Sequence, residues 1–321
     1  MADRALSPPL GNAAWSGHPV VREIVRRREH PNGSQPGVKL GLVVEGGGMR
    51  GVYSGGALVA MEAMGLSSVF DQVYGESAGA INACYFLSRQ GSFGIQIYLD
   101  DLTSWKFANP FRVGTMLDVD YAIDEVVTHT KALDVPAVLA SPSDLFISVT
   151  SVDTGQPRVI DVKREPYPLL SVLKATAAIV PLYNRAVPLD GHRYVDGGIS
   201  NPIPVASAIE GGCTHILVLL TREPDFVSHG YGRLQRYCLA PLLSKWPDAL
   251  VASFFQRQSS RYNETREIAL GTSKVPPGVQ IAMICPASDS PTVGRATTNR
   301  AKLLAAKDDA VRRTREAFGA L

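Results

Sequence analysis

Three short motifs in this sequence combine residue types that can carry out nucleophilic chemistry. A glycine-rich run, GGGMRG, occupies residues 46–51, and a serine flanked by glycines, GESAG, occupies residues 75–79. A third motif, DGG, occupies residues 196–198. A serine hydroxyl can attack a carbonyl carbon, a carboxylate can accept its proton, and backbone N–H groups can hold the resulting negative oxygen. Together the motifs predict an acyl-transfer site.

Ser77 is the candidate nucleophile because its surroundings fit a strand–turn–helix elbow. Apolar residues precede Gly75, and helix-forming residues follow Gly79. In such an elbow the serine lies on a strained turn, and the flanking glycines leave room for backbone and substrate. The pattern alone occurs by chance in roughly one chain in ten. The prediction therefore depends on the strand and the helix around it.

The glycine-rich run predicts an oxyanion hole. Three consecutive glycines indicate a turn that needs positive φ or close approach of another group. A turn at the start of a helix leaves N–H groups unpaired, and one such donor is typically worth about 10²–10³ in rate. The expected donors are the amides of Gly46, Gly47 and Gly48, together with that of Ala78 beside the nucleophile. A purely structural turn is the alternative.

The same run also fits the dinucleotide-binding pattern GxGxxG through Gly46, Gly48 and Gly51. That fold requires an acidic residue at the end of the second strand, about 20 residues further on. Asp71 has about the right spacing but precedes the strand, whereas Glu76 stands at its carboxyl end. A dinucleotide site therefore stays open as an alternative.

The base that activates Ser77 is the discriminating question. Asp196 is expected at the end of a strand, at the same sheet edge as Ser77 if both strands are parallel. Its ordinary pKa of about 3.9 makes it a poor base, and burial in a cleft raises that pKa. The alternative is that the DGG motif is only a turn. His229, in a loop, is the best candidate for a Ser-His-Asp triad.

Taken in order, the three motifs resemble those of the patatin-like phospholipase family, and chiefly its bacterial members. Residues 199–204, which follow DGG, and residues 175–178, which precede it, are also similar to the family's segments. The resemblance covers about residues 39–222. It implies an α/β protein with a three-layer α/β/α fold and a mainly parallel central sheet.

The resemblance also implies a function. The family hydrolyses acyl esters of lipids through a Ser-Asp dyad and an acyl-enzyme, and requires no metal or other cofactor. Carried over by position, Ser77 is the nucleophile, Asp196 is the general base, and Met49 joins the oxyanion donors. Supporting positions are Arg50, Gly51, Gly75, Glu76, Gly79, Gly197 and Gly198.

Glu76 departs from the family pattern, in which the residue before the nucleophile is usually small or uncharged. GESAG also resembles the elbow of type B carboxylesterases, which are longer chains with a histidine after the elbow. A second carboxylate beside the dyad would repel phosphate, so we expect Glu76 to pair with Arg50. A Ser-His-Asp carboxylesterase and a non-catalytic lipid- or protein-binding module with this fold stay open as alternatives.

The elements that must position these motifs are predicted to alternate between strands and helices. Strands are expected over residues 40–44, 72–74, 145–152, 192–195, 215–220 and 279–284. Helices are expected over residues 52–64, 78–88, 169–178, 204–210, 241–261 and 299–318. Continuous apolar strands that alternate with helices favour a parallel sheet covered on both faces.

The length and composition fit one domain preceded by a tail. The chain has 321 residues, of which 45% are hydrophobic. The domain is predicted over residues 39–321, with the motifs in 39–222 and a helical part in 223–321. Residues 1–38 are predicted to be a flexible basic tail because they are rich in Pro, Gly, Ser and Asn. Apolar residues at helical spacing within it, at positions 20–25, predict a short helix.

Charge and cysteine usage narrow the class of protein. The net charge is +2 with no basic stripe, which argues against a nucleic-acid partner. The four cysteines lack CxxC spacing, so we expect neither a disulfide framework nor a zinc site. There is no leader-like segment, and no apolar run approaches the roughly 20 residues of a membrane span. We expect a cytoplasmic protein that acts on a lipid or other acyl ester, with peripheral membrane contact left open.

Overall fold

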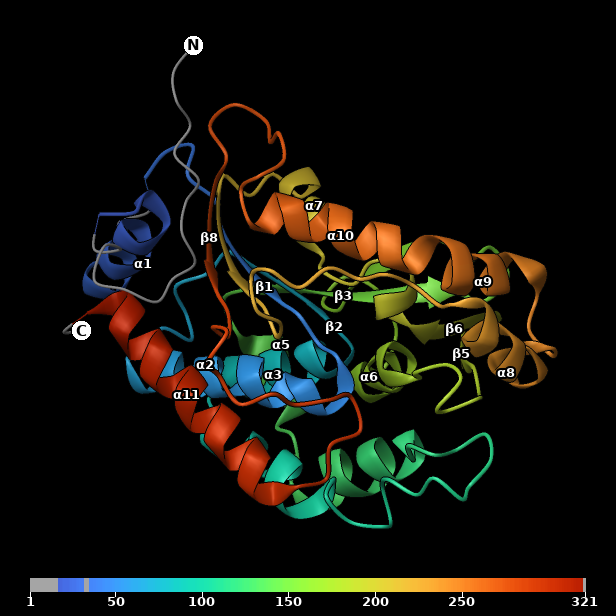
Figure 1. Ribbon diagram of the computed structural model, residues 1–321. Helices are drawn as coiled ribbons and strands as arrows, with labels where there is room; N and C mark the ends of the chain where they lie inside the picture. The colour runs from blue at the N-terminus through green and yellow to red at the C-terminus, as the bar shows by residue number, and fades with distance from the viewer. Residues whose placement is uncertain (1–16, 32–34, 320–321) are drawn as a thin grey trace.

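The computed structural model describes residues 17–31 and 35–319, in which helices cover both faces of one mixed β-sheet (Figure 1). The strands lie in the order β5-β6-β3-β2-β1-β7-β8, and β4 pairs with β3 beside this path. Their bounds are β1 (Leu40–Val44), β2 (Gln72–Glu76), β3 (Asp144–Ser151), β4 (Pro157–Asp161), β5 (Val187–Leu189), β6 (His192–Asp196), β7 (His215–Leu219) and β8 (Gln280–Ile284). Pairing from β3 through β2, β1 and β7 to β8 is parallel throughout, which confirms a mainly parallel sheet.

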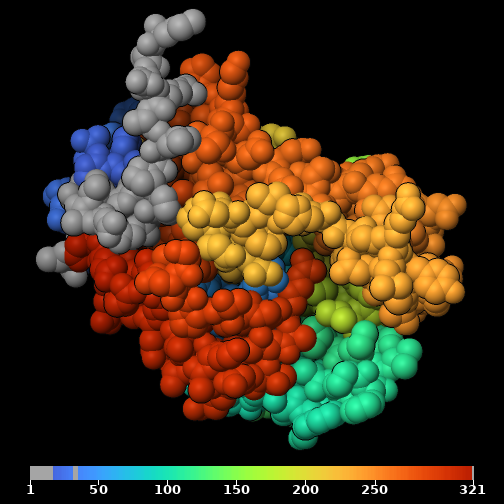
Figure 2. All heavy atoms as spheres, viewed as in Figure 1, coloured from blue at the N-terminus to red at the C-terminus, as the bar shows by residue number. Residues whose placement is uncertain are grey.

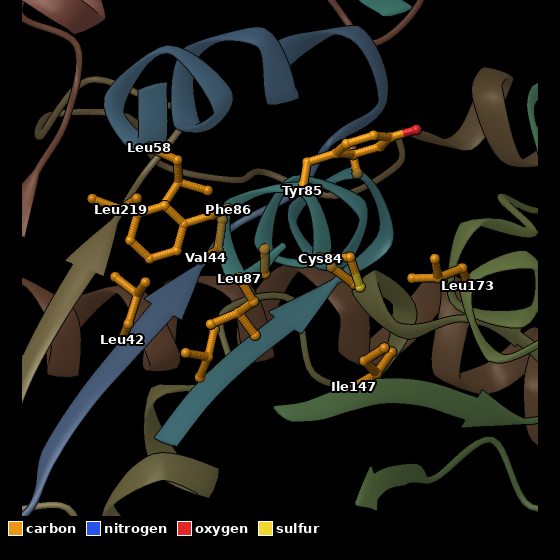
Figure 3. Close-up of a cluster of buried hydrophobic side chains, with 14 of the residues drawn as sticks. Leu42, Val44, Leu58, Cys84, Tyr85, Phe86, Leu87, Ile147, Leu173 and Leu219 are labelled. Atoms are coloured by element: carbon orange, nitrogen blue, oxygen red, sulfur yellow. The ribbon is translucent and has the colours of Figure 1, made fainter. Parts of the chain in front are cut away.

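The helices form one layer on each face of the sheet. The first layer contains α2 (Gly51–Ala63), α3 (Ser77–Leu87), α6 (Leu169–Ala177) and α11 (Arg300–Phe318), and the second contains α7 (Val205–Glu210) and α10 (Gln258–Ala269). Leu42 and Val44 of β1 join the core under the first layer (Figure 3), whereas Val43 joins the core under the second. Successive side chains of a strand point to opposite faces. The three-layer α/β/α fold is therefore confirmed.

Most predicted elements are present within one or two residues of their expected bounds. Helix α2 also ends where the sequence places a stop. Met64 caps the helix, and Gly65 follows with a φ of 75°, a conformation that glycine adopts without steric cost. No helix of the described residues is long and apolar enough to cross a bilayer.

The single helix expected over residues 241–261 is wrong. The structure has α8 (Arg233–Leu243), α9 (Asp248–Ala252), the π-helical turn η5 (Ser253–Arg257) and then α10. Pro247 is the cap residue of α9. Proline disfavours helical backbone in the residue before it, which is consistent with the break in the helix between α8 and α9, although Pro241 lies within α8.

The segment between α3 and β3, for which the sequence analysis made no prediction, is folded into short helices. They are α4 (Gly91–Gly94), η2 (Ile97–Asp101), η3 (Tyr121–Thr130) and α5 (Val135–Ala140), of which η2 and η3 are π-helical. Apolar side chains of this segment join the core of the first layer. Such short and π-helical turns lack the regular period that marks a longer helix in a sequence.

Part of the tail expected to be flexible is instead a packed helix, α1 (Pro19–Glu29). Its buried apolar side chains are Val20, Val21 and Ile24. Arg27 forms two ion pairs at 2.7 Å each, one with Glu23 within α1 and one with Asp71. The pair with Asp71 ties α1 to the start of β2. The predicted short helix is therefore confirmed, and the predicted flexibility is wrong over this range. Residues 1–16 lie outside the described residues.

Replacing Ile24 with alanine tests whether α1 belongs to the folded core. Ile24 is fully buried, so we expect the cavity to lower the free energy of unfolding by about 2–5 kcal/mol. Urea denaturation followed by circular dichroism measures this change. Val25→Ala, at a half-buried position of the same helix, is the matched control and should cost distinctly less. An unchanged free energy of unfolding for Ile24→Ala would contradict the packing of α1.

Candidate active site

Ser77 stands at the junction of β2 and α3 in a strained backbone conformation. Its φ is 50°, within the left-handed region that residues with a side chain rarely adopt. Its N–H donates to Thr176 Oγ1 at 2.8 Å, and the Thr176 hydroxyl donates to the carbonyl oxygen of Ser148 at 2.6 Å. A side chain of α6 therefore holds the backbone of the candidate nucleophile.

The glycines around Ser77 are required by close backbone contacts. A Cβ atom on Gly79 would lie 2.3 Å from the carbonyl oxygen of Val44 in β1. A Cβ atom on Gly75 would lie 2.7 Å from the Cα atom of Ala80. Because non-bonded carbon and oxygen atoms do not approach so closely, only glycine fits at both positions. The strand, the turn and the helix expected around Ser77 are all present.

Asp196 lies near Ser77, but the strand that carries it runs in an unexpected direction. It is the last residue of β6, which is antiparallel to β3, so the expectation of two parallel strands is wrong. β6 pairs with the last three residues of β3, where Asp196 stands opposite Val149. The preceding residue of β3, Ser148, stands opposite Glu76 of β2. This register places the end of β6 and the end of β2 at nearly the same level on the two sides of β3.

The Asp196 carboxyl group is buried, and only one of its two oxygens has a hydrogen-bond partner among the described residues. Its Oδ1 accepts from the Gly198 N–H at 2.7 Å, whereas Oδ2 has no hydrogen-bond partner among the described residues. Burial raises the pKa of Asp196 above its ordinary value, and the Ser77 hydroxyl, the Gly198 amide and the charge of Arg295 oppose that rise. The Ser77 hydroxyl thus favours the ionised carboxylate without a well-aligned hydrogen bond. Such contacts often tighten only when substrate binds.

Glu76 supplies a second buried carboxyl group beside Asp196. Its Oε1 accepts from the Gly46 N–H at 2.7 Å. A Cβ atom on Gly198 would lie 3.1 Å from Glu76 Oε2 and 2.8 Å from Asp196 Oδ1, so both carboxyl groups border that glycine. Burial, and then the charge of Asp196, raises the pKa of Glu76 well above its ordinary value. Two neighbouring buried carboxyl groups resist joint ionisation, and we expect Glu76, whose pKa is raised by the charge of Asp196, to be the second of the two to ionise.

The predicted pairing of Arg50 with Glu76 is wrong. The Arg50 guanidinium instead packs against the glycine-rich turn, where a Cβ atom on Gly47 would lie 2.6 Å from Arg50 Nη2. Its Nε is buried without a hydrogen-bond partner among the described residues. Burial, and then the nearby charge of Arg295, lowers the pKa of Arg50 to about 10. Gly47 has a φ of 117° and leaves space that the guanidinium fills.

The glycine-rich turn offers fewer free amides than predicted. The Gly46 N–H is taken by Glu76, and the Met49 N–H donates to the carbonyl oxygen of Arg295 at 3.0 Å. The prediction that these two amides face an oxyanion is therefore wrong for this conformation. The amides without a partner among the described residues are those of Gly47, Gly48 and Ala78. The Ala78 amide adjoins the turn, since a Cβ atom on Gly46 would lie 3.0 Å from it.

An apolar pocket extends from Ser77 into the first helix layer. Its cavity volume is about 60 Å³. Its walls include Met49 of the glycine-rich turn, Ile81 of α3, and Ile179. The segment between α3 and β3 contributes Ile97, Tyr98, Leu102, Phe107, Leu117, Val119, Ala122 and Val127. This pocket suits an unbranched apolar chain attached to a group at Ser77.

A polar pocket lies on the other side of the site. A small cavity that contains Ser77, Glu76 and Asp196 is also lined by Arg50 and Arg295. Both arginines also line the larger polar pocket, which has a cavity volume of about 370 Å³ and adds a third arginine at position 222. Figure 2 shows a hollow between gold atoms of the segment after β7 and red atoms of the segment before α11. Ser77 therefore lines both the apolar pocket and the small cavity, which shares Arg50 and Arg295 with the cationic pocket.

The sequence of residues 42–209, just over half of the chain, matches the family described as patatin-like phospholipase. The chain belongs to this family. The matched range begins in β1 and ends in α7, so it contains Ser77 and Asp196. Arg222 and Arg295 of the cationic pocket lie beyond it.

This patatin-like chain is 29% identical over 210 residues to the uncharacterized protein YjjU of Escherichia coli (strain K12). That alignment covers 63% of this chain and 58% of YjjU, which is less than two thirds of the relative's length. Among solved structures, VipD from Legionella pneumophila has a TM-score of 0.47 at 14% identity, over 89% of this chain and 67% of VipD. The type III effector protein ExoU has a TM-score of 0.29 at 14% identity, over 73% and 54% of the two chains.

The structure disfavours two alternative sites in this patatin-like fold. His229 lines the polar pocket, and no histidine is among the described residues that line the small cavity at Ser77. Asp71 pairs with Arg27 and accepts from the Leu40 N–H at 2.6 Å, at the opposite end of β2 from the glycine-rich turn. It is therefore a structural carboxylate, not a ribose ligand.

Thr176 is one residue near the candidate nucleophile for which no role was predicted from the sequence. It was noted only within a segment similar to the family. Its hydrogen bond to the Ser77 amide joins residues 99 positions apart. No local spacing signals such a contact, so only the family likeness of residues 175–178 pointed toward it.

Replacing Glu76 with glutamine removes one titration and keeps an oxygen that can accept from the Gly46 N–H. With a soluble ester, kcat/KM of the unchanged protein should fall on the acid side, where Asp196, the candidate base, gains a proton and can no longer accept one. Because burial raises the pKa of Asp196, this fall should occur at higher pH than for an ordinary carboxyl group. On the basic side kcat/KM should fall again, where Glu76 ionises and opposes the charge of the oxyanion.

The Glu76→Gln variant should keep the fall on the acid side and lose the fall on the basic side. Rates measured across both transitions for the two proteins check this expectation. A basic-side fall of unchanged position in the variant would contradict the assignment of that transition to Glu76. Circular dichroism of the variant controls for a change of fold.

Proposed function

We propose that this chain is a serine acyl hydrolase that cleaves carboxylic esters of lipids through an acyl-enzyme on Ser77. The observation that carries the proposal is the position of Ser77 between an apolar pocket and a cationic pocket, with the Asp196 carboxyl group beside it. A lipid ester has an apolar chain on one side of the ester carbonyl and a polar group on the other. The two pockets match these two parts.

In the first half-reaction, the Ser77 hydroxyl transfers its proton to Asp196 as Oγ bonds to the ester carbonyl carbon. The carbonyl oxygen becomes an oxyanion, and the free amides of Gly47, Gly48 and Ala78 can donate to it. When the tetrahedral intermediate collapses, the bond to the leaving alcohol breaks. That alcohol takes the proton from Asp196 and leaves the acyl group on Ser77.

In the second half-reaction, water replaces the alcohol. Asp196 accepts a proton from the water as the water oxygen bonds to the acyl carbon. Collapse of the second intermediate breaks the bond to Ser77 Oγ, which recovers its proton from Asp196. The carboxylic acid is released. The raised pKa of Asp196 makes it a stronger base for both proton transfers than an ordinary aspartate.

The cationic pocket supports an anionic group beside the ester. The Nε atoms of Arg50 and Arg222 are buried without hydrogen-bond partners among the described residues. Arg295 lines the same pocket. Both carboxylate oxygens of Glu45 already accept hydrogen bonds, one from the Tyr262 hydroxyl and one from the Thr221 N–H. Guanidinium groups bind phosphate through paired N–H donors. We therefore include phosphate-bearing lipids among the proposed substrates.

Alanine at Ser77 and asparagine at Asp196 test the dyad. Each variant should lose hydrolysis of a p-nitrophenyl acyl ester by about three orders of magnitude or more, since each removes the nucleophile or its base. His229→Ala should retain activity and serves as the matched control. Strong loss in His229→Ala would instead support a Ser-His-Asp carboxylesterase.

A fluorophosphonate probe separates catalysis from a binding role that keeps the fold. The unchanged chain should be labelled, and the Ser77→Ala variant should not. Absence of labelling in a folded, unchanged chain would contradict the proposed hydrolase and support a non-catalytic module.

Glutamine at Arg222 tests the anionic substrate group. We expect kcat/KM for a phospholipid to fall about tenfold more than kcat/KM for a neutral ester, because hydrogen bonds to charged groups are worth about 1.5–3 kcal/mol. Arg193→Gln changes an exposed arginine paired with Asp153 and is the matched control. Equal losses on the two substrates for Arg222→Gln would contradict a phosphate site.

A further inference from the structure

The loop that follows η2 presents large apolar side chains to solvent. Trp105, Phe111 and Val113 are 65%, 82% and 83% exposed. The rings of Trp105 and Phe111 stack, with centroids 6.2 Å apart. These three residues form the apolar tip. A cluster of exposed aromatic and aliphatic side chains marks a surface that is covered by another apolar body.

Helix α8 presents a second apolar surface. Leu234 and Tyr237 are 76% and 80% exposed, and exposed Pro241 lies on the same face at helical spacing. We call these residues the outer stripe of α8. Leu243, at the end of α8, is instead buried in the core that also holds Phe254. The helix is therefore apolar on the face that packs inward and again on the face that looks outward.

Asn184 joins these two surfaces. Its N–H donates to the carbonyl oxygen of Gly114 at 2.6 Å, next to the apolar tip. Its Nδ2 donates to the carbonyl oxygen of Leu242 at 2.8 Å, near the end of α8. Figure 2 shows the two segments, in teal and gold, on the same face of the molecule. The apolar tip and the outer stripe thus belong to one continuous side of the protein.

The two segments that form this side carry charges of one sign. Neither residues 103–117 nor residues 226–246 contain an aspartate or a glutamate. Their basic residues are Lys106, Arg112, Arg233, Arg236 and Lys245. Arg112 pairs with Asp118, just outside the loop, whereas the other four form no ion pair among the described residues. An apolar surface with a cationic rim is complementary to a bilayer that contains anionic lipids.

The apolar tip is also continuous with the proposed acyl pocket. Phe107 and Leu117 belong to the same loop, but their side chains are buried and line the pocket that extends to Ser77. The loop therefore has apolar side chains facing both the pocket and the solvent. An acyl chain that moves from a bilayer at this surface into the pocket would stay in contact with apolar side chains.

We propose that the apolar tip and the outer stripe of α8 dock the protein on an anionic lipid bilayer. Trp105 and Tyr237 enter the interfacial region, where indole and phenol side chains are favoured. Lys106, Arg233 and Arg236 meet the anionic headgroups. The proposal rests on the proposed function for the identity of the substrate, but the docking step itself requires no catalysis.

Vesicle co-sedimentation with the full chain tests the surface. The unchanged protein should bind vesicles of phosphatidylcholine and phosphatidylglycerol more strongly than vesicles of phosphatidylcholine alone. The double variants Phe111→Ser/Val113→Ser and Leu234→Ser/Tyr237→Ser should each bind about tenfold or more weakly, because each removes two exposed apolar side chains. Leu139→Ser, at a 44% exposed leucine of α5, is the matched control and should bind like the unchanged protein.

Two further measurements keep docking and catalysis distinct. Both double variants should hydrolyse a soluble ester like the unchanged protein, and Ser77→Ala should still bind vesicles. Vesicle binding without any ester hydrolysis would contradict the proposed function and still support the docking surface. Failure of the unchanged chain to bind anionic vesicles, or equal binding by the double variants, would overturn the docking surface. Concentration-dependent self-association lost in the same variants would assign the surface to a second copy of the chain.

Discussion

The site depends on one constrained residue, Ser77, whose left-handed backbone costs roughly 1–3 kcal/mol. Local sequence does not supply that energy. The Gly79 backbone packs against the Val44 carbonyl of β1, and Thr176 of α6 accepts from the Ser77 amide. A strand on one side and a helix on the other must therefore be in place before the hydroxyl takes its position. The geometry of the candidate nucleophile is a property of the packed sheet and not of a loop.

Burial has opposite effects on the acidic and basic groups around Ser77. It raises the pKa of Asp196 and of Glu76, and it lowers the pKa of Arg50. Arg295 partly offsets the effect on both carboxyl groups because its positive charge favours their ionised forms. The electrostatics of the site thus depend on a residue near the end of the chain, outside the range that matches the family.

Two segments beyond the motifs decide what can reach Ser77. The one between α3 and β3 lines the apolar pocket, and the one after β7 lines the cationic pocket. No helix or strand was predicted for the first segment, because its short π-helical turns lack a regular period of apolar residues. In the second, the sequence predicts one long helix where Pro247 separates two. The two pockets beside Ser77 are therefore formed where sequence patterns are least informative.

The sequence by itself determined the sheet, the elbow at Ser77 and the candidacy of Asp196. Apolar strands and the glycines that a turn requires are local features, so short stretches of the sequence are enough to recognise them. Only the tertiary structure decided that β6 runs antiparallel, that Glu76 takes the Gly46 amide, and that Arg50 stands apart from Glu76. Each of these depends on contacts between segments distant in the chain. Spacing along a sequence carries no information about which distant groups share one buried space.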